Sequence, residues 1–204
     1  MITFEAIRTR RSVREYSEKD VPEEALFELL EAVRWAPSAH NAQPWRFIII
    51  RDDVLKKKLA KGMAIELEKD LKKDKSSRGE RERLVNDSIS QFSGAPVIIV
   101  PCLTMEDMYE YRDRRRKKAE YVMGVQSVAA AIENLLLVAH SIGLATCWFC
   151  APLFCPKAVR EVLNTSENLE PQAIVTLGYP NENPKPPPRK PLEQIMIEIG
   201  GLRR

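Results

Sequence analysis

Two short polar clusters near the start of the chain carry residue types that can hold a cofactor. Residues 10–14, the arginine cluster, read Arg-Arg-Ser-Val-Arg. Guanidinium groups and a hydroxyl are suited to binding a phosphate. Residues 37–45, the amide turn, offer amide and hydroxyl side chains between two prolines and a tryptophan. Such groups can hydrogen-bond the edge of a flat heteroaromatic ring, so the two clusters together predict a cofactor with a phosphate and a ring.

The chain has little that would support catalysis by its own side chains. It contains 2 histidines and lacks the Gly-x-Ser-x-Gly and His-Glu-x-x-His patterns of hydrolases. His40 lies in the amide turn, but a single histidine is more often hydrogen-bonded or exposed than catalytic. We therefore predict no catalytic side chain, no metal site and a reaction carried out by a bound cofactor.

The sequence also narrows the choice of cofactor. The phosphate loop Gly-x-x-x-x-Gly-Lys and the dinucleotide fingerprint Gly-x-Gly-x-x-Gly are absent, and the chain has only 8 glycines. What remains is a phosphate held by arginines and a ring held by amides. Flavin mononucleotide (FMN) has both groups and is the cofactor that we predict.

Four cysteines leave a second kind of chemistry open. Cys147 and Cys150 form a C-x-x-C pair, which is typical of thiol redox sites and zinc sites. A zinc site would need two more ligands, and Cys155 follows too closely to form a second such pair. The cysteines lie in or beside apolar runs, where reduced cysteine packs as a small hydrophobic residue. We expect them to be buried and reduced, and we place thiol chemistry behind a flavin.

One amphipathic helix separates the two clusters. Residues 22–35 begin with proline and two glutamates and repeat leucines at helical spacing, and Pro37 ends the pattern. Residues 45–50 are apolar and partly β-branched, which predicts a buried strand directly after the amide turn. The same patterns predict strands at 95–103, 144–149 and 172–177, and a short helix at 156–163.

Two further segments bear on assembly. Residues 53–93 are highly charged and predict two exposed helices, a charged helical flap. Residues 119–142 predict the longest helix, and its centre is apolar nearly all round. A small domain has few elements to surround such a helix, so we expect it to lie at the interface of a homodimer.

The end of the chain reads as an arm. Residues 181–191 are rich in proline and predict an extended spacer, and residues 195–199 have strong strand propensity. A strand at the end of a spacer is suited to pairing with another sheet. We expect residues 181–204 to form a swapped C-terminal arm that adds a strand to the partner subunit.

Composition limits the remaining choices. A length of 204 residues favours a single domain, residues 1–204. The net charge of +3 is too small to predict nucleic acid or an anionic membrane surface as a partner. We see neither a secretory signal nor a stretch approaching a membrane span, so we expect a cytoplasmic protein with small-molecule substrates.

Several segments, in this order, resemble the nitroreductase family over nearly the whole chain. They are Arg-Arg-Ser-x-Arg at 10–14, Trp-Ala-Pro-Ser-Ala-x-Asn-x-Gln-Pro-Trp at 35–45, Gly-Leu-Ala-Thr-Cys-Trp at 143–148, Leu-Gly-Tyr-Pro at 177–180 and Arg-Lys-Pro-Leu at 189–192. Among the branches of the family, residues 36–45, 124–131 and 147–156 look most like the flavin domain of the bifunctional enzyme of deazaflavin coenzyme biosynthesis.

The resemblance implies an α+β fold with a central mixed β-sheet flanked by helices. It also implies a homodimer that exchanges C-terminal arms and holds one FMN in each of two interfacial sites. The cofactor-binding residues that it implies on one side of the flavin are Arg10, Arg11, Ser12, Arg14, Cys147, Trp148, Cys150, Ala151 and Arg189. Those that it implies from the other subunit are Pro37, Ser38, Ala39, Asn41 and Gln43.

The implied activity is a ping-pong oxidoreductase. NAD(P)H or a reduced deazaflavin would pass hydride to FMN, and a small acceptor would then take the electrons. The acceptor would be a nitroaromatic, a quinone or a dehydro precursor of a deazaflavin coenzyme. The alternative is a non-catalytic flavin- or deazaflavin-binding module.

Overall fold

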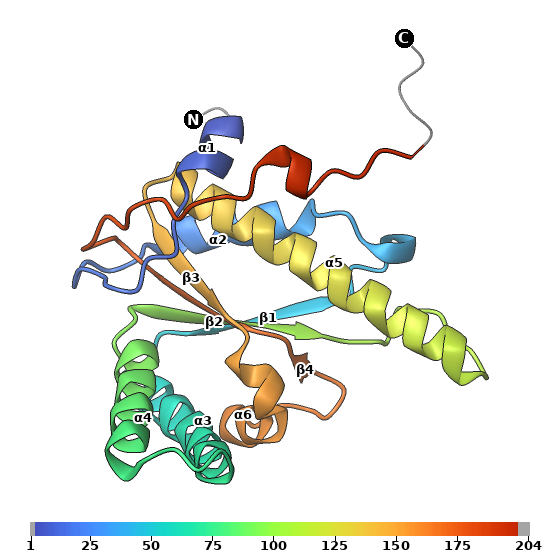
Figure 1. The fold of residues 1–204 in the computed structure, drawn as a ribbon. Coiled ribbons are helices and arrows are strands. Elements are labelled where there is room, and N and C mark those ends of the chain that lie inside the picture. Colours follow the sequence, from blue (N-terminus) through green and yellow to red (C-terminus); the bar gives the residue numbers. More distant parts are fainter. Residues whose placement is uncertain (1–2, 200–204) are drawn as a thin grey trace.

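The computed structural model describes residues 3–199 of the chain (Figure 1). Six α-helices and five strands alternate in a pattern that is largely the one the sequence predicts. The helices are α1 (Thr3–Thr9), α2 (Glu23–Arg34), α3 (Asp53–Lys73), α4 (Arg78–Ser93), α5 (Arg114–Ser141) and α6 (Pro156–Leu163). The strands are β1 (Trp45–Ile50), β2 (Val97–Leu103), β3 (Ala145–Phe149), β4 (Glu170–Pro171) and β5 (Ile174–Gly178), and three 3₁₀ turns are η1 (Ala39–Asn41), η2 (Ala151–Phe154) and η3 (Leu192–Gln194).

The strands form one sheet in the order β1-β2-β5-β3, with the short β4 paired to β2. The expectation of an α+β fold with helices around a central sheet is confirmed. The expected mixed pairing is wrong for the named strands, because β1, β4 and β5 all pair antiparallel with β2, and β3 pairs antiparallel with β5. The only parallel pairing within the described chain is an isolated bridge between Ser12 and Thr146.

Helices cover both faces of the sheet (Figure 1). On one face, α2 and α5 pack against the sheet through a core that includes Leu29 and Leu135. On the other face, a second core joins the sheet to α3 and α6 and includes Leu59 and Met63. The expected exposed flap at 53–93 is therefore wrong for α3, because its inner face is part of this core, although its outer face carries the charges.

Helix α5 organises the face on which the candidate site lies. It begins at Arg114, earlier than predicted, because the Asp113 carboxylate accepts a hydrogen bond from the Arg116 amide and caps the basic run. By length and composition, α5 could cross a membrane, which the sequence analysis did not foresee. In the fold, its apolar residues pack against α2, α1 and the sheet instead.

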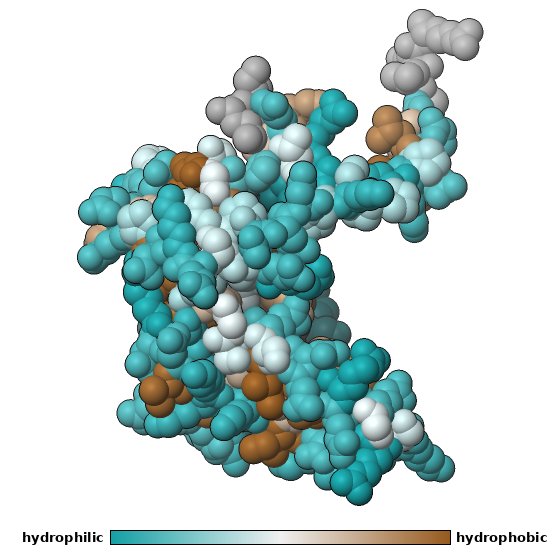
Figure 2. Space-filling view, turned by 90° about the vertical axis from the view of Figure 1, so that its left-hand side faces the viewer, coloured by the Kyte–Doolittle hydropathy of each residue, from teal (hydrophilic) through white to brown (hydrophobic). Residues whose placement is uncertain are grey.

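The C-terminal arm leaves the sheet after β5. Asn181 donates a backbone hydrogen bond to Glu15, and the chain is exposed from residue 185 to residue 199. Residues 195–199 form no strand in this single chain, where η3 is the only regular element beyond β5 within the described residues. Figure 2 shows the arm standing away from the main body, and hydrophobic side chains lie near its end.

Candidate cofactor site

The arginine cluster runs beside strand β3. Arg10 closes α1 by donating its backbone N–H to Ala6, and the chain then turns along the sheet edge. The Val13 amide donates to the Thr146 carbonyl at 3.0 Å, next to the bridge between Ser12 and Thr146. Residues 12 and 13 thus extend the sheet beyond β3. This pairing fixes the arginine cluster next to the predicted cofactor segment that begins at Cys147.

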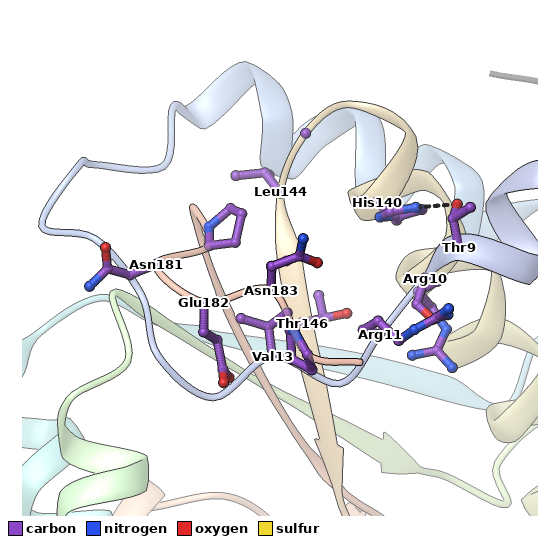
Figure 3. A pocket seen from close by; sticks show the side chains of 14 residues that line it. Thr9, Arg10, Arg11, Val13, His140, Leu144, Thr146, Asn181, Glu182 and Asn183 are labelled. Atoms are coloured by element: carbon purple, nitrogen blue, oxygen red, sulfur yellow. Dashed lines mark hydrogen bonds between the residues drawn. The ribbon is translucent and has the colours of Figure 1, made fainter. Parts of the chain in front are cut away.

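A cavity of about 540 Å³ opens at this edge (Figure 3). The Thr9 hydroxyl and the His140 Nε2 atom lie 2.8 Å apart on its wall and join the end of α1 to the end of α5. The pKa of His140 is lowered, first by burial and then by the positive charges of Arg10 and Arg11. Two guanidinium groups, Arg10 and Arg11, line the cavity with one carboxylate, Glu182, and guanidinium groups favour an anionic ligand. Its lining residues are Thr9, Arg10, Arg11, Val13, His140, Gly143, Leu144, Ala145, Thr146, Pro180, Asn181, Glu182, Asn183 and Pro184.

The base of the arm closes one side of the cavity. A Glu182 carboxylate oxygen accepts hydrogen bonds from the backbone amides of Arg14, at 2.5 Å, and Glu15, at 3.2 Å. These two amides are therefore already satisfied, and an anion here would be held by side chains. Arg189 lies farther along the arm, is exposed, and is not among the lining residues that the structure describes. The structure does not bring it to the arginine cluster within one chain.

The predicted segment from Cys147 to Ala151 spans the end of β3 and the start of η2. Cys147 is buried and Cys150 is exposed, whereas Trp148 and Ala151 are half-buried. The indole Nε1 of Trp148 is buried without a hydrogen-bond partner. Buried donors normally have a hydrogen-bond partner. The Nε1–H group of Trp148 has none, so it is available to an acceptor atom of a ligand at this end of the strand.

The expectation that the cysteines are buried is wrong for Cys150, which is exposed, and is confirmed for Cys102, Cys147 and Cys155. The three buried thiols are poorly suited to redox chemistry. Burial raises the pKa of Cys147, although Arg14, a hydrogen bond from Ser12 and Arg10 act in the opposite direction. Burial also raises the pKa of Cys102 to about 12 and that of Cys155 to about 11. Because the thiolate is the reactive form, these environments disfavour thiol exchange. Among residues 3–199 no group of three or more potential ligands could hold a metal ion.

The amide turn lies on the other half of α5. Its backbone is unusual, since His40, Asn41 and Gln43 all have positive φ angles, of 56°, 53° and 49°. The Ala39 amide donates to the Ser127 hydroxyl at 3.1 Å, and the Gln43 amide donates to the Ser38 hydroxyl at 3.1 Å. Pro37 and Asn41 are exposed. The turn is thus anchored to α5 while part of it faces outward.

The two predicted halves of the site are far apart within one chain. Thr9, which directly precedes the arginine cluster, meets α5 at His140, whereas the amide turn meets it at Ser127. A separation of 13 positions corresponds to about 20 Å of helix. The structure therefore groups Arg10, Arg11, Ser12 and Arg14 with Cys147, but it does not bring the amide turn to them.

The sequence analysis missed several residues of this site. Glu182 and His140 line the cavity, and Ser127 and Glu120 of α5 hold the amide turn. Glu120 had one detectable signal, since it is an acidic residue at the border between a basic run and an apolar helix. Its partner lies 80 positions away, and spacing gives no indication of that contact.

The lowered pKa of His140 leads to a prediction about how stability depends on pH. Because its pKa in the folded state lies below the ordinary 6.5, the unfolded chain binds a proton more readily. The free energy of unfolding should thus fall as pH drops through about 6.5 toward 5, and this loss should be smaller in His140→Gln. Urea unfolding of both proteins at about pH 7.5 and pH 5 measures it. Equal losses in the two proteins would contradict the lowered pKa.

Comparison with known sequences decides the family. Residues 7–179 match the sequence profile of the nitroreductase family. The chain belongs to the nitroreductase family. It is therefore an oxidoreductase, as the ordered motifs had implied.

Individual nitroreductase relatives support this assignment. A protein of Archaeoglobus fulgidus, provisionally named NADH dehydrogenase/NAD(P)H nitroreductase, is 33% identical over 181 residues, which cover 86% of this chain and 84% of that protein. A BluB-like flavoprotein from Clostridium difficile 630 has a TM-score of 0.81 at 27% identity and covers 98% of this chain and 99% of its own. A provisionally named nitroreductase of Desulfovibrio desulfuricans, solved with FMN, has a TM-score of 0.72 at 28% identity over 98% of both chains.

Proposed function

We propose that this nitroreductase-family chain is an FMN-dependent oxidoreductase that passes electrons from NAD(P)H to a small acceptor. The observation that carries the proposal is the cavity lined by Arg10 and Arg11 of the arginine cluster, next to the start of β3. A solved relative of similar fold contains FMN. The Archaeoglobus relative is named for NADH and NAD(P)H chemistry, which supports a nicotinamide donor.

The residues present fit FMN. Arg10 and Arg14 both lower the pKa of the Cys147 thiol, so their charges converge near the middle of β3, where Ser12 also lies. These side chains would hold the phosphate. The Arg14 amide would not contribute, because it already donates a hydrogen bond to Glu182. The unpartnered Trp148 Nε1 would donate toward the flavin side of the site. When bound, FMN supplies the two-electron transfer, and the protein orients the ring and limits its contact with water.

A second copy of the chain would complete the site. In a two-fold dimer that packs α5 antiparallel to its equivalent, with the axis passing between residues 133 and 134, the His140 end of one helix lies beside the middle of the other, where Ser127 is. That arrangement places the arginine cluster of one protomer near Pro37, Ser38, Ala39, Asn41 and Gln43 of the partner subunit. Partly exposed residues, including Val122, Ala129 and Leu137, form a stripe on α5 that supports this packing.

The same dimer would give the arm a role. Five large apolar side chains on the arm are exposed in the single chain: Leu192, Ile195, Met196, Ile197 and Ile199. Apolar surface of this kind normally marks an interface. We propose that the arm packs on the partner subunit, that residues 195–199 form a strand there, and that Arg189 reaches the partner's phosphate site.

Reconstitution with FMN followed by turnover tests the proposal. The purified protein should bind FMN and show flavin absorbance bands, and it should oxidise NADH or NADPH repeatedly when a quinone or nitroaromatic acceptor is added. A non-catalytic binding module would show one reduction and no cycling. Reduced deazaflavin as donor and a dehydro deazaflavin precursor as acceptor form separate arms of the same assay. A protein that binds no FMN would contradict the proposal.

A further inference from the structure

A buried carboxylate stands behind the amide turn. Glu120 of α5 is 1% exposed, and its Oε1 atom lies 3.0 Å from the Nε2 atom of His40. The same oxygen accepts the backbone N–H of Tyr109 at 2.9 Å. Burying a carboxylate without partners is strongly unfavourable, so these two donors account for its presence in the core. One of the two donors is a side chain that can change its protonation state.

The fold holds the His40 ring in one place. Its ring stacks on that of Tyr109, with centroids 4.0 Å apart and planes inclined by 24°. The positive φ of His40 costs roughly 1–2 kcal/mol in a residue that has a Cβ atom. Glu120 and Ser127 are seven residues, two helical turns, apart on α5, and both bind the turn. Backbone strain of this kind persists only where many surrounding contacts hold the conformation in place, and it is concentrated at functional sites.

The contact with Glu120 makes the two ring nitrogens unequal. A hydrogen bond from Nε2 to the carboxylate keeps a proton on that nitrogen. No residue within the described chain hydrogen-bonds the Nδ1 atom, and the groups packed on the ring are the Glu120 carboxylate of α5 and the Tyr109 ring. Proton exchange by His40 therefore takes place at Nδ1. Glu120 stabilises the imidazolium and the neutral form that remains after Nδ1 has lost its proton.

We propose that His40 donates a proton from Nδ1 to the acceptor as the acceptor is reduced, and that Glu120 is its positioning residue. This rests on the proposed function, in which the amide turn meets the flavin of the other subunit. For a quinone acceptor, a hydride from the reduced flavin adds to one carbonyl oxygen. The Nδ1–H bond breaks, and its proton adds to the other oxygen to give the hydroquinone. The neutral imidazole then regains a proton from solvent.

Comparing two electron acceptors distinguishes proton donation by His40 from electron transfer by the flavin. With menadione, His40→Gln should lower the rate of the oxidative half-reaction by about 10²-fold or more. With ferricyanide, which takes electrons without protons, the variant should match the wild type. Glu120→Gln should lower menadione reduction by about 10- to 100-fold, whereas Glu82→Gln, an exposed carboxylate control on α4, should not.

A spectroscopic readout tests the positioning role without turnover. The chain has 2 histidines, so their ¹⁵N resonances can be assigned by comparison with His40→Gln. In the wild type, the neutral form of His40 should be the Nε2–H tautomer alone. In Glu120→Gln it should become a mixture, because the amide can donate as well as accept. Thermal unfolding confirms that both variants fold, and His40→Gln stays informative if Glu120→Gln is unstable.

Failure of the proton-donor proposal can be distinguished from failure of the proposed function. If the protein binds no FMN, or NAD(P)H does not bleach it, the proposed function has failed. If the flavin is reduced normally and His40→Gln keeps the wild-type menadione rate, the proton-donor proposal is overturned. An unchanged tautomer in Glu120→Gln would overturn the role of Glu120. Loss of ferricyanide reduction in His40→Gln would also contradict the proposal, since it would show a defect in electron transfer.

Discussion

Replacing Arg10 and Arg14 together by alanine is expected to weaken FMN binding by about 10²- to 10⁴-fold. Both guanidinium groups act on Cys147 in the middle of β3, and a hydrogen bond to a charged group contributes about 1.5–3 kcal/mol. Two such contacts to a phosphate sum to that loss of affinity. Fluorescence titration of the apoprotein with FMN measures it, because flavin emission changes on binding.

Riboflavin is the matched ligand for this prediction, since it has the same ring and no phosphate. The double variant should bind riboflavin about as well as the wild type does. Arg34→Ala is the matched protein control, because Arg34 is an exposed arginine on α2 that pairs with Glu31. An equal loss of affinity for FMN and riboflavin would show that the arginines do not bind the phosphate. Unchanged FMN affinity would remove them from the site.

The double variant Ile197→Asp, Ile199→Asp is expected to split the dimer and to release FMN. The two side chains are 89% and 92% exposed in the single chain, so the substitutions leave the core of the protomer intact. Covering an isoleucine contributes about 1.5–3 kcal/mol, so losing two raises the dissociation constant of the dimer by about 10²- to 10⁴-fold. Sedimentation velocity across a dilution series measures the dimer, and flavin absorbance of the protein peak measures retained FMN.

Alternation along a strand supplies the control. Residues 197 and 199 would share one face of the added strand, and Glu198 would point to the other. Glu198→Ala should therefore leave both the dimer and the flavin content unchanged. A monomeric double variant that retained FMN would refute the shared site. A double variant that remained dimeric would show that the arm does not hold the subunits together.

Much of the fold could be predicted because its signals are local. Helix α2 follows from a proline start, first-turn glutamates and leucines at helical spacing, and β1 follows from a short β-branched run.

The error at α3 has a physical cause. A helix whose outer face is rich in lysine and glutamate reads as exposed, and only the position of the sheet shows that Leu59 and Met63 are covered. Strand pairing depends on partners far away in sequence, so the mixed sheet was an inference from resemblance rather than from the residues.

The arm illustrates a different limit. Residues 195–199 have the composition of a strand, yet they form none in the single chain. A strand needs a neighbour to satisfy its backbone groups, and nothing within one protomer supplies that neighbour to the end of the arm. Strand propensity is therefore compatible with an exposed, irregular segment until a second sheet edge is available.

By itself, the sequence indicated candidate residues for the chemistry: arginines and a serine for a phosphate, amides for a ring, and a Cys-Trp-Phe-Cys segment after both, in a chain that matches the nitroreductase family. Only the tertiary structure decided how they are grouped. It placed the arginine cluster on β3 through the bridge of Ser12 to Thr146, and the amide turn about 20 Å away along α5. It also joined His40 to Glu120. The reason is that residue type and spacing act within a few turns of chain, whereas these contacts are set by how one long helix crosses the sheet.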